Sequence, residues 1–173
     1  MALNATPKSP TANSYLTEVE ANTILTEEWL NADAWVAAVT AKREAALIMG
    51  TFLMEAAFIY EGSRTDITQA LRLPRHSLVD QDGYTIDHNT VPKLAKKACA
   101  VFANYLLAAN RLADPELVGL GISSASLGPI SVTIDPGQVK SMIPKDVILI
   151  MEPIADLDPA ASSGMRMVKL ERG

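Results

Sequence analysis

The sequence of 173 residues is poor in the side chains that build disulfides and metal sites. Cys99 is the only cysteine, which excludes an internal disulfide and a zinc site made from several cysteines of one chain. The two histidines, His76 and His88, lack the spacing of a paired metal site. Aromatic residues make up only 5% of the chain, so the packing must rely mainly on aliphatic and methionine side chains. We expect no cofactor and no metal.

The patterns of catalytic and nucleotide-binding sites are also missing. Ser124 and Ser126 stand outside a nucleophile-elbow pattern, and Gly119-Leu120-Gly121 lacks the third glycine of a dinucleotide loop. Counted from Asp80, the glycine comes fourth and the twelfth residue is valine, whereas an EF-hand needs glycine at the sixth position and glutamate at the twelfth. A tight turn explains this segment better. The sequence therefore predicts a protein that is not an enzyme.

Long apolar runs and an excess of positive charge are absent as well. Residues 45–60 form the richest apolar window, but Gly50, Thr51 and Glu55 interrupt it before it reaches the about 20 residues of a membrane span. The N-terminus has no apolar core of a signal peptide. A net charge of −5 argues against a dedicated duplex-binding protein. We expect a soluble protein, assembled in a reducing cytoplasm, with no membrane partner.

What the sequence does contain is a high proportion of hydrophobic residues, 49%, arranged with helical spacing. A first long helix is predicted at Thr40–Tyr60, apolar nearly all round, which is typical of a helix that is central in a domain or buried against neighbouring subunits. A second, Val91–Leu112, follows the i, i+3, i+4 pattern. We predict a mainly α fold: a small helical bundle with two long helices, a short β-hairpin or strand region, and an extended C-terminal arm.

The organisation of the chain follows from these elements. Thr17 and Glu20 have the form of a capping box at the start of a first helix. Clean alternation predicts a strand at Ile130–Ile134, and Val147–Met151 suits a short helix. The expected segments are a flexible N-terminal tail at 1–13, a helical core at 14–114, a linker with strand or hairpin and short helix at 115–152, and the arm at 153–173.

Two segments are candidates for contacts with partners. The loop Gln69–Gly83 lies between the two long helices. A helix cannot continue through it, because it contains Pro74 and the turn pair Asp82-Gly83. Long ordered loops commonly carry binding residues, so Arg72 and Arg75 are interaction candidates. The second segment alternates apolar and basic residues near the C-terminus, as a strand would that pairs with a partner's edge. Its candidate residues are Met165, Arg166, Val168 and Leu170.

An ordered set of short motifs gives the chain a family resemblance over roughly residues 14–170. The motifs are Ser14-Tyr15-Leu16-Thr17, Glu20-Ala21-Asn22, Trp35, Gly62, Arg64-Thr65, Gln69-Ala70-Leu71, Pro74-Arg75, Asp80, Asp82-Gly83, Val91-Pro92 and Ser126–Val132. With them the chain resembles the head–tail connector, or adaptor, proteins of tailed bacteriophages, including relatives labelled DnaT-like single-stranded-DNA-binding proteins. Leu73 departs from the pattern, because an aromatic residue is expected before Pro74-Arg75.

The resemblance implies a non-enzymatic virion protein at the neck, assembled in the host cytoplasm. Such proteins form a homo-oligomeric ring, commonly a dodecamer, below the portal protein, and offer a platform to a tail or neck protein. Genomic double-stranded DNA passes through the ring without specific binding. Arg72 and Arg75 would then contact a subunit or the portal.

The alternative is a single-stranded-DNA-binding module. Lys93, Lys96 and Lys97 make a basic row on the second long helix, with Arg72 and Arg75 nearby in the sequence. Single-strand binding combines a basic groove with aromatic stacking surfaces. The nearby aromatic residues are Tyr84, Phe102 and Tyr105, and the last two fall on the apolar stripe of that helix. A solvated helix face is the competing explanation for the lysines.

Overall fold

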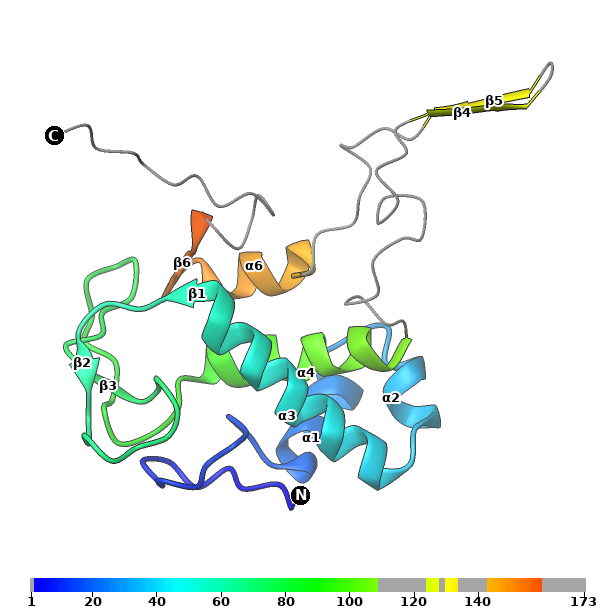
Figure 1. Ribbon diagram of the computed structural model, residues 1–173. Coiled ribbons are helices and arrows are strands. Elements are labelled where there is room, and N and C mark those ends of the chain that lie inside the picture. The colour runs from blue at the N-terminus through cyan, green and yellow to red at the C-terminus, as the bar shows by residue number, and fades with distance from the viewer. Residues whose placement is uncertain (1, 109–123, 128–129, 134–142, 160–173) are drawn as a thin grey trace, which may run out of the picture.

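The computed structural model describes residues 2–108, 124–127, 130–133 and 143–159, and it is mainly α-helical (Figure 1). The helices of these residues are α1 (Glu18–Glu27), α2 (Asp33–Ala37), α3 (Thr40–Ala57), α4 (Lys93–Ala108) and α6 (Lys145–Met151). Three two-stranded antiparallel ladders accompany them. They pair β1 (Phe58–Ile59) with β6 (Asp156–Leu157), β2 (Ser63–Arg64) with β3 (Arg75–His76), and β4 (Ser124–Leu127) with β5 (Ile130–Thr133). The predicted small helical bundle with two long helices is confirmed.

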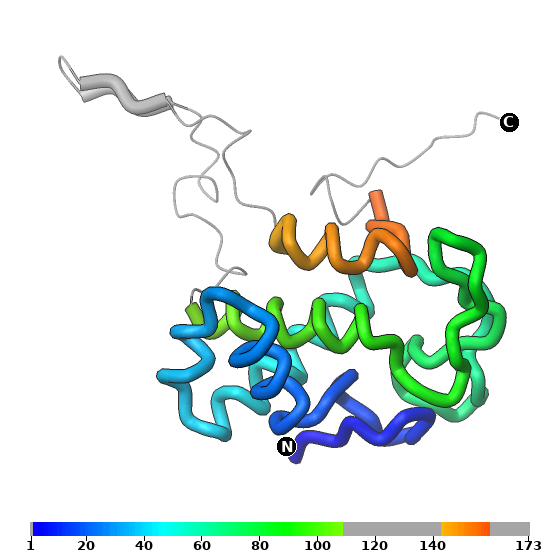
Figure 2. Tube along the Cα trace, turned by 180° about the vertical axis from the view of Figure 1, so that it is seen from behind, coloured from blue at the N-terminus to red at the C-terminus, as the bar shows by residue number. Residues whose placement is uncertain are grey.

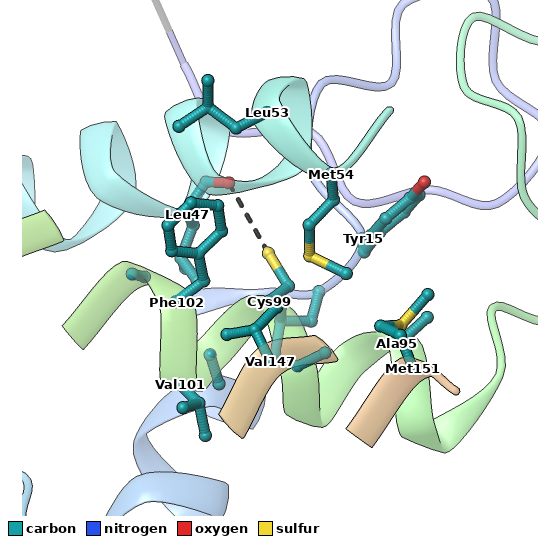
Figure 3. Close-up of a cluster of buried hydrophobic side chains, with 14 of the residues drawn as sticks. Tyr15, Leu47, Leu53, Met54, Ala95, Cys99, Val101, Phe102, Val147 and Met151 are labelled. Atoms are coloured by element: carbon teal, nitrogen blue, oxygen red, sulfur yellow. Dashed lines mark hydrogen bonds between the residues drawn. The ribbon is translucent and has the colours of Figure 1, made fainter. Parts of the chain in front are cut away.

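Helix α4 is the centre of the bundle, because α1, α2, α3 and α6 all contact it (Figures 1 and 2). The core between α3, α4 and α6 contains Leu47, Met54, Phe102, Val147 and Met151, all fully buried (Figure 3). A run of alanines on α4 and Gly50 on α3 keeps the two helices close. A Cβ added at Gly50 would lie 3.7 Å from the Cys99 carbonyl oxygen. Small side chains therefore replace the aromatic packing that the sequence lacks.

The beginning of α1 agrees with the sequence, whereas the end of α3 does not. The Thr17 hydroxyl accepts a bond from the Glu20 N–H, and the Glu20 carboxylate accepts one from the Thr17 N–H, so the capping box is confirmed. Helix α3 ends at Ala57 and not at Tyr60, because Phe58 turns extended and pairs with Leu157 in β6. Gly62 lies in the connection between β1 and β2.

Helix α2 is held by side chains from other elements and not by a cap of its own. Ala32 is the N-cap and makes no side-chain hydrogen bond. Instead the Asn104 side chain accepts a bond of 3.0 Å from the Trp35 N–H. Trp35 is fully buried and anchors α2 in the core.

The N-terminal segment differs from the expected flexible tail. The Ala70 N–H donates to the Ser9 carbonyl oxygen over 3.1 Å, and Lys8 Nζ donates to Asn89 Oδ1 over 2.7 Å. The Asn4 N–H donates to Asn13 Oδ1 over 2.7 Å, which closes the segment into a loop. The segment is therefore bonded to residues far along the chain, a long-range pairing that local composition does not reveal.

The C-terminal boundary also lies later than expected. Helix α6 contains the predicted short helix Val147–Met151, and β5 confirms most of the predicted strand Ile130–Ile134; Ile134 lies outside the described residues. Residues 153–157, assigned to the arm, belong to the core instead, because β6 pairs with β1 and Ile154 is buried. In the described part of the chain, no helix is both long and apolar enough to cross a membrane.

Candidate functional site

The guanidinium groups of Arg72 and Arg75 bind the protein's own backbone. Arg72 Nη1 donates to the Phe58 carbonyl oxygen over 2.9 Å. Arg75 Nε donates to the Glu61 carbonyl oxygen over 2.7 Å, and its Nη2 donates to that of Gly62. The two side chains therefore fasten the loop Gln69–Gly83 to β1 and to the turn that follows it. Their expected role in partner contacts stays a prediction. Such contacts would have to use the guanidinium N–H groups that do not take part in these hydrogen bonds.

Gln69, the first residue of the loop, has a structural role that the sequence did not predict. Its side chain is buried, and its Nε2 donates to the carbonyl oxygens of Leu71 at 2.7 Å and Pro74 at 3.0 Å. Its Oε1 accepts a bond of 3.0 Å from the Asp66 N–H. A buried amide with all three groups bonded fixes a loop more firmly than apolar contacts alone, because each unmade bond would be costly. The loop is thus a rigid feature of the surface.

Glu55 on α3 joins the N-terminal segment to this loop. Its carboxylate accepts bonds from the Arg72 N–H at 2.8 Å and from the Tyr15 hydroxyl. The Tyr15 hydroxyl also lies 3.3 Å from the Tyr60 hydroxyl. Burial raises the pKa of the Glu55 carboxyl, although the bonds from Tyr15 and Arg72 lower it in part. Burial likewise raises the pKa of both tyrosines.

The raised pKa of Glu55 predicts a specific pH dependence of stability. The folded state holds the Glu55 proton to higher pH than the unfolded chain, whose glutamates titrate near 4.5. The free energy of unfolding contributed by this group is therefore largest below that pH and falls as the pH rises through the folded value. Urea denaturation from pH 4.5 to 8 should show the wild type losing stability relative to Glu55→Gln. A pH-independent difference between the two proteins would contradict this.

The lysine row of α4 is partly neutralised by carboxylates of α1. Lys96 Nζ lies 2.5 Å from Glu20 Oε1, and Lys97 Nζ lies 3.0 Å from Glu28 Oε2. Lys93 is exposed and makes no ion pair with any described residue. Among the described residues, the row therefore presents one cation without an ion pair, where a groove that tracks a nucleic-acid backbone uses several.

The three aromatic side chains that could stack with bases do not form an exposed surface next to the lysine row. Phe102 is fully buried, and the hydroxyl of the half-buried Tyr105 donates to Asp146 Oδ2 at 2.5 Å. Tyr84 is 74% exposed but lies in the turn after Asp80. That turn is closed by a Gly83 N–H bond of 2.9 Å to the Asp80 carbonyl oxygen, which confirms the tight turn expected there.

The cysteine is packed in the core, and the two histidines lie against each other. Cys99 is fully buried, and its thiol lies 3.3 Å from the Thr51 hydroxyl. Burial raises the pKa of this thiol to about 12, so it is not a reactive thiolate. The rings of His76 and His88 lie 4.3 Å apart, centroid to centroid. Within the described residues no group of three or more potential ligands could hold a metal ion.

The face of α3 that points away from α4 is an open apolar surface. An open hollow of about 550 Å³ lies over it, lined among the described residues by Ala41, Glu44, Ala45, Ile48, Met49 and Phe52. Phe52 is 66% exposed and Met49 42%. We name these six residues the α3 face. The sequence predicted a helix apolar nearly all round. In the structure one side of it is buried in the bundle and the other is open.

The C-terminal candidates, Met165, Arg166, Val168 and Leu170, lie outside the described residues. Of the predicted site residues, the described part of the chain brings Arg72 and Arg75 together: the Arg72 N–H donates to the Glu55 carboxylate, and Arg75 Nη1 donates to the Arg72 carbonyl oxygen. The sequence did contain an indication of the α3 face, because the helix predicted at Thr40–Tyr60 has no clear polar side. Nothing in the local sequence pointed to Glu55 as the residue that joins two distant segments.

Comparison with curated proteins and with solved structures found no match. One family model does match, over residues 1–173, which is the whole chain. The description of this family names DnaT-like single-stranded-DNA-binding proteins and does not mention connector proteins. The chain belongs to the family described as "Putative DnaT-like ssDNA binding protein".

Proposed function

We propose that the protein is a non-enzymatic structural subunit that self-associates through the α3 face into a ring, as a head–tail connector of a phage virion. The α3 face carries this proposal. It combines Phe52 and Met49, residue types enriched at protein interfaces, with small alanines that let another surface approach closely. An apolar helix face of this kind is an unusual feature for a chain that acts alone.

A closed ring requires head-to-tail contacts, in which one surface of a subunit meets a different surface of the next. The α3 face supplies one of these surfaces, and the rigid loop Gln69–Gly83 offers a separate platform for the portal or for a tail or neck protein. The net charge of −5 suits a channel through which double-stranded DNA slides without being held. These partners, and a place in the virion neck, are part of the proposal.

Single-stranded-DNA binding is the second candidate, and the family match favours it. The described geometry favours it less, because Lys96 and Lys97 would have to give up their carboxylate partners to bind phosphates. Lys93 alone is exposed and outside any ion pair with described residues. A strand-binding site would therefore need basic residues beyond this row.

Two measurements on the purified protein separate the candidates. For the connector, electron microscopy or mass photometry of the protein mixed with portal should show rings, or rings attached to portal. Persistent monomer without portal binding would contradict it. For strand binding, a salt titration with labelled oligonucleotides should give at most weak binding at physiological salt. Micromolar binding that disappears when Lys93, Lys96 and Lys97 are changed to glutamine would instead favour the family's description.

A further inference from the structure

Three arginines lie close together at the β2–β3 ladder, at the end of the molecule opposite α2 (Figure 1). Arg64 in β2 is the ladder partner of Arg75 in β3, so the two side chains leave the same face of the ladder with their Cβ atoms about 5 Å apart. Arg75 Nη1 also donates to the Arg72 carbonyl oxygen over 3.4 Å. We name Arg64, Arg72 and Arg75 the arginine cluster.

The arginine cluster carries more positive charge than the described carboxylates neutralise. Burial lowers the pKa of the Arg75 guanidinium, and the positive charges of Arg64 and Arg72 lower it further. Glu55 Oε2 lies 3.9 Å from Arg72 Nε, whereas Arg64 and Arg75 make no ion pair with any described residue. Like charges directly opposite each other in a ladder are destabilising. A bound anion would therefore relieve the repulsion within the cluster.

The fold holds two of the three guanidinium groups in fixed positions and leaves the third open. Those of Arg72 and Arg75 donate to backbone carbonyl oxygens of β1 and the turn after it. Arg64 is exposed, and its Nη1 makes one long contact of 3.5 Å with the Gln69 carbonyl oxygen. Bonds to described residues thus use only part of the N–H groups of the cluster. A planar guanidinium binds phosphate through paired N–H groups, and one held in place loses less conformational entropy on binding.

We propose that the arginine cluster binds the phosphate groups of single-stranded DNA. This inference rests on the strand-binding candidate function, which needs basic residues beyond the lysine row of α4 because that row is partly paired with carboxylates. A flexible strand can bring adjacent phosphates to a compact group of cations. Affinity for a duplex instead rests on neutralising many phosphates, which a chain with a net charge of −5 does not favour.

Fluorescence anisotropy with a labelled oligo-dT of about 12 nucleotides tests the proposal at about 50 mM salt, where phosphate contacts are stronger than at physiological salt. Arg64→Gln is the informative variant, because it leaves the backbone bonds of Arg72 and Arg75 in place. It should weaken binding about tenfold. It should also lower the slope of log Kd against log salt by about 0.7, which a purely structural role of Arg64 would not do.

Two further variants separate the shape of the guanidinium from its charge. Arg64→Lys keeps the charge and loses the planar fork, so it should keep the salt slope and recover only part of the affinity. The matched control is Lys42→Gln, which removes one exposed cation near the start of α3, about 20 Å along the helix from Glu55. Its affinity should stay within about twofold of the wild type, because salt screens a charge so far from the cluster. Urea denaturation should show all three variants folded.

The possible failures are distinguishable. Unchanged binding by Arg64→Gln, or equal weakening by Arg64→Gln and Lys42→Gln, would overturn the proposal and leave strand binding to another part of the chain. Absence of any strand binding by the wild type would contradict the strand-binding candidate itself, and this inference with it. Poly-glutamate that displaces the strand at an equal concentration of charges would assign the cluster to an acidic protein segment, and would also overturn the proposal.

Discussion

Replacing Phe52 by glutamate should abolish self-association while leaving the subunit folded. Phe52 is the largest exposed side chain of the α3 face, and aromatic anchors at interface centres commonly contribute about 2 kcal/mol or more to binding. A buried carboxylate without a partner adds a further penalty. We expect the subunit dissociation constant to rise at least about 100-fold, measured by analytical ultracentrifugation or by mass photometry of portal complexes.

The control for this prediction is Val19→Glu. Val19 is another exposed apolar residue, but it lies on α1 and away from the α3 face. Exposed substitutions of this kind usually change the free energy of unfolding by about 0.5 kcal/mol or less, so both variants should unfold like the wild type. Equal loss of assembly in the two variants, or rings that survive Phe52→Glu, would show that the α3 face is not the subunit contact.

The sequence predicted those parts of the fold that depend on local patterns. The i, i+3, i+4 spacing placed the second long helix, and the structure describes it as α4 (Lys93–Ala108). Thr17 and Glu20 marked the start of α1 because a capping box needs only residues three apart. The apolar character of α3 nearly all round predicted a helix central in the domain or buried against neighbouring subunits, and the structure buries one side of it in the bundle.

The remaining features depend on residues distant in sequence, which single-sequence patterns do not reveal. The N-terminal segment has the composition of a tail, yet Ser9 accepts a bond from Ala70, and Tyr15 bonds to Glu55. Arg72 and Arg75 have the charge of partner-binding residues, but they bind backbone carbonyls that only the folded loop brings near them. The sequence located this loop, whereas the backbone contacts of its two arginines follow only from the fold; their role in partner contacts stays a prediction.

The loop also depends on the close approach of Gly62 to the backbone of His76, which lies far along the chain. It has a φ of +72°, which favours glycine, and it lies directly against the backbone of β3. A Cβ added there would lie 2.0 Å from the carbonyl oxygen of His76. Because that oxygen belongs to the backbone, no side-chain rotation can relieve the overlap. The β2–β3 ladder, in which Ser63 pairs with His76, would have to move.

Gly62→Ala should therefore be the most destabilising small substitution in this part of the chain, with a loss of about 3–4 kcal/mol. Gly83→Ala is the matched control, because Gly83 has a φ of +84° but no atom within 4 Å of the added Cβ. It should cost only the backbone strain, about 1–2 kcal/mol. Urea denaturation of both variants measures the difference. Similar losses would mean that strain alone acts at Gly62, and that β2 and β3 can separate without cost. A larger loss at Gly62 would show that the close approach between these strands holds the loop Gln69–Gly83 in place.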